Sequence, residues 1–192
     1  MERLGRHDRA AANAGAGLGD VWRARLPFRS VNRLDKPGHQ PGMQRHHLLP
    51  CQLLAARCFG PLFDAIGRDR LRFDDFRSNG LLLPASGESA VRMQLPLHRG
   101  PHRDYNSMVS ERVGQIEGDW SRMRLVAPEI ALDQALMRVD LLQRALCRRL
   151  LSPERARMRL NRRDPLGTGL DFAEIDAMAD LLWAGTASGM ST

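Results

Sequence analysis

The chain has 192 residues, of which 43% are hydrophobic and 5% aromatic, so it is long enough to bury the core of one domain and is not wholly disordered. It carries 29 basic against 22 acidic side chains, and the resulting formal net charge of +7 favours polyanionic partners. No apolar run approaches the ~18–20 residues that span a bilayer, which excludes a membrane span.

The N-terminal region is rich in alanine and glycine, and we expect residues 1–25 to form a flexible arm. This arm is positively charged but has no continuous apolar segment, so it does not have the form of a Sec signal. Cys51, Cys58 and Cys147 lack CxxC spacing, which is typical of reduced thiols in the cytosol. We therefore expect a protein that is cytoplasmic where it is made, and that a non-Sec secretion route would have to deliver to any target cell.

The next elements are short. Apolar residues recur at helical spacing over residues 52–66, and Gly60-Pro61 should kink or split this helix. The acidic turn Phe-Asp-Asp-Phe at 73–76 leads to a short strand at 80–84, which ends in a proline.

The second half of the chain is mainly helical in pattern. We expect a loop up to about Gly100, followed by a helix over 101–116 whose first residue is Pro101. A long amphipathic helix is predicted over 128–151, starting at a proline. A further helical turn at 152–154 and a final helix over 171–185 complete the prediction.

Four of the six histidines fall into two clusters, His46-His47 and His98-x3-His102. Imidazole is the most common metal ligand and the side chain that titrates closest to neutral pH. Neighbouring side chains on an extended segment point to opposite faces, so one ring of the first pair can face a metal ion while the other faces an attacking water. These are the components of a one-metal phosphodiesterase site.

Asn79 lies between the two clusters, at the head of the strand at 80–84. An asparagine on a strand paired with the histidine segment could fix the local backbone and so support a base histidine. The alternative is an ordinary turn formed by Asn79-Gly80.

The second cluster permits two roles. His98 precedes the predicted helix in a loop that Gly100 bends, and we expect His102 in the first turn of that helix. Both could bind a metal ion, but the positive end of a helix dipole favours phosphate, so His98 could contact the scissile phosphate instead. Arg99 and Arg103 flank the site and could bind non-bridging oxygens.

Taken together, these motifs resemble the AHH family of bacterial toxin nucleases, in the HNH or His-Me finger superfamily. The resemblance covers about residues 32–116. It rests on Asn32-Arg33-Leu34, Gly38, Gly42, Arg45-His46-His47-Leu48-Leu49-Pro50, Asn79-Gly80, Leu83-Pro84, His98-x-Gly100-x-His102-x-x-Tyr105 and Val109. One departure is Arg45, which stands where the family usually has a small residue and could add a phosphate contact.

The resemblance implies an α+β, mostly helical protein with a ββα-metal core at residues 26–120 and an added helical region at 121–192 packed on that core. By position, His47 matches the general base, and Asn79 matches the asparagine that supports the base strand. His46 and His102 match the metal ligands. A similarity to nuclease colicins, in which both histidines of the last pair bind metal, adds His98 as a third ligand.

The motifs and the resemblance predict a metal-dependent endonuclease that cleaves DNA or RNA with one divalent ion (Mg, Mn, Zn or Ni), and the resemblance implies that it is a toxin or effector. The phosphate-binding candidates are Arg45, Arg99 and Arg103. One alternative is a non-catalytic, zinc-stabilised nucleic-acid-binding module of the same fold, and another is an interaction protein whose histidines only pack. A nuclease would endanger its maker, so we also expect an acidic immunity protein as a partner.

Overall fold

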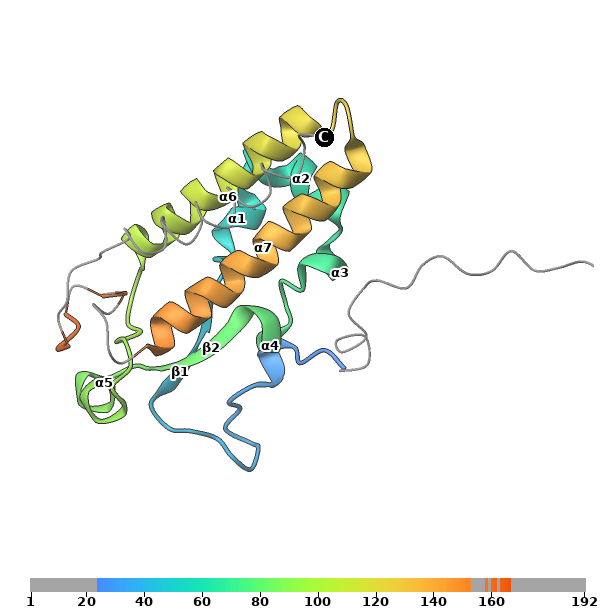
Figure 1. The fold of residues 1–192 in the computed structure, drawn as a ribbon. Helices are drawn as coiled ribbons and strands as arrows, with labels where there is room; N and C mark the ends of the chain where they lie inside the picture. Colours follow the sequence, from blue (N-terminus) through green and yellow to red (C-terminus); the bar gives the residue numbers. More distant parts are fainter. Residues whose placement is uncertain (1–23, 153–157, 159, 162, 167–192) are drawn as a thin grey trace, which may run out of the picture.

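The computed structural model describes residues 24–152, 158, 160–161 and 163–166 (Figure 1). The predicted arm at 1–25 therefore lies almost wholly outside the described residues, as do most of the helical turn at 152–154 and the whole of the final helix at 171–185. Within the described part, no helix is both long enough and apolar enough to cross a bilayer.

A two-stranded antiparallel sheet forms the base of the site. Strand β1 (Met43–His47) pairs with β2 (Gly80–Pro84), and the register places His46 opposite Leu81 and His47 opposite Gly80. A Cβ at Gly80 would collide with the ring of Phe76, so this position requires glycine. The predicted strand at 80–84 is confirmed, and its partner is the segment with the first histidine pair.

Short helices connect the two strands. The expected helix at 52–66 is split into α1 (Gln52–Ala55), the 3-10 turn η2 (Arg57–Phe59) and α2 (Gly60–Ile66). Pro61 lies in the first turn of α2, where a missing N–H costs nothing, so Gly60-Pro61 begins a helix. Two further helices, α3 (Arg68–Leu71) and α4 (Phe76–Asn79), surround the predicted acidic turn, and Asp75 caps α4 by accepting from the Arg77 N–H at 3.2 Å.

The predicted loop between β2 and Gly100 is partly wrong, because it contains helix α5 (Gly87–Met93). The Ser86 side chain caps this helix by accepting from the Ser89 N–H at 3.2 Å, and Ala90 is fully buried. An N-cap and one buried side chain thus define a helix too short to show helical periodicity in the sequence.

Two long helices, α6 (Arg103–Met123) and α7 (Pro128–Leu151), lie side by side (Figure 1). The predicted bounds of α7 are confirmed. Their buried faces form the main core with α2, and the side chains that contribute most include Leu62, Phe63, Ile66, Val109, Val113, Ile116, Val139, Leu142 and Leu146. The expected boundary between residues 120 and 121 falls within α6 and stays a prediction.

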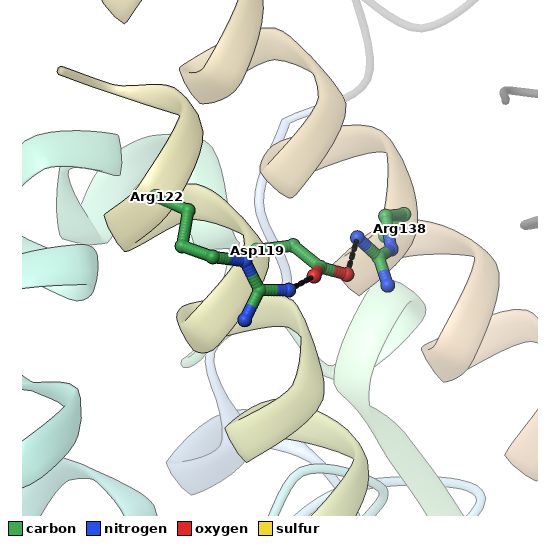
Figure 2. Close-up of polar contacts among 3 residues, drawn as sticks. All are labelled: Asp119, Arg122 and Arg138. Carbon is green, nitrogen blue, oxygen red and sulfur yellow. Dashed lines mark hydrogen bonds and ion pairs between the residues drawn. The ribbon is translucent and has the colours of Figure 1, made fainter.

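An ion pair joins the two long helices on their outer side. Asp119 of α6 accepts from Arg138 of α7 at 2.7 Å and also from Arg122 (Figure 2). The Arg138 side chain is only 11% exposed, so this contact is better shielded from solvent than an ordinary surface ion pair.

Candidate metal centre

Three histidines converge although they are distant in sequence. His46 comes from β1, His98 from the loop before α6, and His102 from the residue that precedes the first turn of α6. The ring centroids of His98 and His102 are 4.5 Å apart. The ring centroid of His46 lies 5.0 Å from that of His98 and 5.6 Å from that of His102. One possible ligand atom from each ring lies within 4.8 Å of the others, a separation that suits three ligands of one ion.

His46 is the buried member of this triad, with 3% of its surface exposed. Its ring packs edge-on against Tyr105, and its Nε2 is buried with no hydrogen-bond partner in the described part of the chain. An unsatisfied buried ring nitrogen is costly unless a ligand uses its lone pair. Burial and then the neighbouring His98 lower the pKa of His46 well below its usual value, so this ring is neutral and suited to a cation.

His98 is oriented by its neighbours in the hairpin. Its backbone N–H donates to the Pro84 carbonyl at 2.8 Å, and its Nδ1 lies 3.1 Å from Gln44 Oε1. Because an amide oxygen only accepts, Nδ1 carries the proton and Nε2 is left for an ion. Burial and then the charge of His102 lower the pKa of His98 to about 4, which keeps the ring neutral at pH 7.

His102 is oriented by a backbone carbonyl. Its Nδ1 lies 2.9 Å from the oxygen of Leu160, which fixes the proton on Nδ1 and again leaves Nε2 for an ion. Helix α6 begins at Arg103, so the prediction that Pro101 starts the helix and that His102 lies in its first turn is wrong. His102 is instead the N-cap, with φ −102° and ψ 59°, and Gly100 turns the preceding loop with φ +79°.

His47 lies on the other side of β1, apart from the triad. Its ring stacks on Phe28, with centroids 3.6 Å apart and planes inclined by 2°. Burial lowers the pKa of His47, while the Asp74 carboxylate acts in the opposite direction. A half-buried, neutral imidazole with a fixed plane is a suitable proton acceptor.

Asn79 supports the backbone that follows His47. The residue is fully buried, and its Oδ1 accepts from the Leu49 N–H at 2.7 Å while its Nδ2 donates to the Phe73 carbonyl at 3.0 Å. Its own carbonyl accepts from the Leu48 N–H at 2.8 Å. Asn79 ends α4 and Gly80 begins β2, so the alternative of an ordinary Asn-Gly turn is wrong.

Three contacts at this site were not assigned from the sequence. Phe28 stacks on His47, the Tyr105 hydroxyl donates to the Leu48 carbonyl at 2.6 Å, and Gln143 Nε2 donates to Asn79 Oδ1 at 3.3 Å. Gln143 had a signal in the sequence, because it is a polar residue on the apolar stripe of α7 and such residues are buried only with a partner.

The three arginines proposed for phosphate lie close to the triad histidines in the sequence. Arg45 donates to the Phe28 carbonyl at 2.8 Å and, with His98, lines a pocket of about 300 Å³. Arg99 and Arg103 are exposed and flank His102 in the chain. The structure thus brings His46, His98 and His102 together, with His47 on the opposite face of β1 and the three arginines nearby in the chain.

The model of the AHH family, described as a nuclease family of the HNH/ENDO VII superfamily with conserved AHH, matches residues 27–143, more than half of the chain. The chain belongs to the AHH family. Neither the curated proteins nor the solved structures give a match. The match runs further than the resemblance at 32–116 and includes most of α7.

Membership of AHH places the chain in a nuclease family of the HNH/ENDO VII superfamily. The α+β fold, with its hairpin and following helix, is consistent with an HNH-type ββα core. Within the matched range the sequence has one pair of adjacent histidines, His46-His47, and Arg45 stands before it where the conserved AHH of the family has alanine. Arg45 points to the Phe28 carbonyl, and its exposed position on β1 explains why a large side chain is tolerated there.

Proposed function

We propose that this protein is a metal-dependent endonuclease that hydrolyses phosphodiester bonds of DNA or RNA. The observation that supports this most directly is the buried, unpartnered Nε2 of His46 beside the rings of His98 and His102. A nucleic-acid substrate follows from the AHH family, and the net charge of +7 favours it.

His46, His98 and His102 would hold one divalent ion through Nε2, since the Nδ1 atoms of His98 and His102 have acceptors of their own. The donor set fits such an ion, and three imidazole nitrogens favour Zn or Ni over Mg, which prefers oxygen ligands. When bound, a divalent cation stabilises the charge that develops on the phosphate and on the leaving oxygen.

His47 would accept the proton of the attacking water. Its lowered pKa leaves the ring unprotonated at neutral pH, and the contact with Phe28 holds the ring plane before substrate arrives. Asn79 would act as a positioning residue, because its side chain holds Leu49 two residues after His47. Arg45, Arg99 and Arg103 would neutralise phosphate oxygens.

A toxin or effector role is part of this proposal, as AHH resemblance implies a nuclease that harms a target cell. Its maker would then need an acidic immunity protein, which the +7 charge would attract rapidly. Synthesis in the cytoplasm followed by a non-Sec route of delivery would fit this role.

The test is cleavage of supercoiled plasmid and of structured RNA by the purified full chain with Mg²⁺, Mn²⁺, Zn²⁺ or Ni²⁺. We expect nicking or degradation with at least one of these ions and none in EDTA. Stoichiometric metal binding without cleavage of either polymer would contradict the nuclease and support the zinc-stabilised binding module instead.

A further inference from the structure

The described residues that follow α7 lie against the loop that carries His98 and His102. These residues are Met158, Leu160, Asn161 and Arg163–Leu166, here named the C-terminal strap. We propose that the strap positions His102, and through the loop His98, for the metal ion. This inference rests on the proposed function, and family membership does not supply it, because the strap lies outside the matched residues 27–143.

The strap contacts the loop at three points along its length. Leu160 accepts from His102 Nδ1 at 2.9 Å, and the Asn161 side chain donates to the Arg99 carbonyl. Asp164 Oδ2 accepts from the Leu97 N–H at 3.0 Å. The loop is thus held just before His98, just after it, and at His102 itself.

The strap is itself fixed in place, so it can serve as a reference for the loop. Met158 and Leu160 are 2% and 4% exposed and belong to the main core. The Asp164 carboxylate, on a residue 9% exposed, also accepts from the Leu166 N–H at 3.0 Å, and the Asp164 N–H donates to the Asn161 carbonyl at 3.1 Å. A buried carboxylate that accepts two backbone N–H groups forms strong, charge-assisted hydrogen bonds.

The contact with Leu160 decides which nitrogen of His102 is available. A carbonyl can only accept, so it selects the tautomer with the proton on Nδ1 and the lone pair on Nε2. Without the strap, both tautomers of His102 would be populated. The loop, which turns at Gly100, would also be free to move the His102 ring to other positions. Loss of such an outer contact to a metal-binding histidine typically weakens metal affinity by about 10- to 100-fold.

The experiment compares Asp164→Ala, Asp164→Asn and the matched charge control Asp64→Ala, which removes an exposed carboxylate of α2, all in the full chain. Zn²⁺ affinity is measured by competition with a chelating dye. The tautomer of His102 in the metal-free protein is read from long-range ¹H–¹⁵N NMR spectra. We expect Asp164→Ala to bind Zn²⁺ at least about tenfold more weakly and to mix the two tautomers.

Asp164→Asn should recover part of the affinity, because its amide oxygen can still accept from Leu97, and Asp64→Ala should match the original chain. Asp164→Ala with a lower melting temperature but unchanged Zn²⁺ affinity and tautomer would overturn the proposal, since the strap would then be only structural. Cleavage of plasmid and RNA by the unsubstituted chain is measured in a separate assay. Zn²⁺ binding without cleavage refutes the nuclease, while the affinity comparison still decides the role of the strap.

Discussion

The imidazole of His47 lies flat on the phenyl ring of Phe28, with their centroids 3.6 Å apart. Phe28 belongs to the short 3-10 turn η1 (Phe28–Ser30), which the chain reaches well before β1. The contact therefore joins the start of the family match to the proposed base, and it restricts rotation of the imidazole ring.

If this stacking orients the base, Phe28→Leu should lower kcat several-fold while leaving Zn²⁺ affinity unchanged. Leucine keeps most of the apolar volume of a residue that is 6% exposed but loses the flat surface. Phe76→Leu is the matched control, because Phe76 meets Phe28 edge-on at 5.1 Å and belongs to the same aromatic cluster. Steady-state cleavage and dye competition make the comparison, and equal kcat for both variants would argue against a positioning role for Phe28.

His47→Ala should lower the cleavage rate by about 10²- to 10⁴-fold. It should retain Zn²⁺ binding, since the proposed base is not a ligand. His46→Ala should instead lose Zn²⁺ affinity, because it removes the buried ligand of the triad. His39→Ala serves as the control for loss of a histidine in the loop before β1. Cleavage by His47→Ala at the rate of the original chain would show that another group takes the proton.

Cleavage should also depend on pH in a direction set by His47. The base acts unprotonated, and its pKa is lowered from 6.5 by burial, so kcat should be level above pH 6.5 and fall only at a more acidic pH. The profile is measured with metal saturating at each pH. A rise in kcat that begins well above pH 6.5 would contradict a half-buried, neutral His47 as the base.

The metal-free protein should lose stability as the pH falls from 6.5 towards 4. His98 has a folded pKa of about 4 against an ordinary value of 6.5, so the unfolded chain binds protons first in this window. For a histidine whose folded pKa is lowered, stability is fully present above the unfolded pKa and decreases as the pH drops below it. Urea unfolding in EDTA measures this, and His98→Gln should show a smaller loss between pH 6.5 and 4.

Asn79→Ala should destabilise the fold by about 2–4 kcal/mol, because it leaves the Leu49 N–H and the Phe73 carbonyl buried without partners. The control is Asn106→Ala, whose side chain contacts Gln52 at an exposed position and should cost less than about 0.5 kcal/mol. Urea unfolding compares the two, and similar losses would refute the supporting role of Asn79.

Elements with a strong local signal were predictable from the sequence. Helix α7 has a proline at its first turn and a long apolar stripe, and β2 is a short apolar run that ends in proline, so both were found with their bounds. Helices α3, α4 and α5 are one or two turns long. Such helices depend on caps and tertiary packing, which leave little periodicity to detect.

The parts of the candidate site that consist of distinctive side chains could be predicted from the sequence. The histidines and Asn79 are recognisable because imidazole and carboxamide groups at this spacing match a nuclease motif. The Leu160 carbonyl is not recognisable, because every residue has a carbonyl and this one reaches His102 from 58 positions away. The start of α6 was predicted at Pro101 because proline favours the first turn of a helix. In the structure His102 is the N-cap, and the helix begins at Arg103.

Gln143 of α7 donates to the same oxygen of Asn79 that receives the Leu49 N–H. The side-chain amide of Asn79 thus connects α7 to the backbone that follows His47. A variant screen that considers only the histidines would omit Gln143, although its loss would remove a hydrogen bond to the asparagine that supports the proposed base.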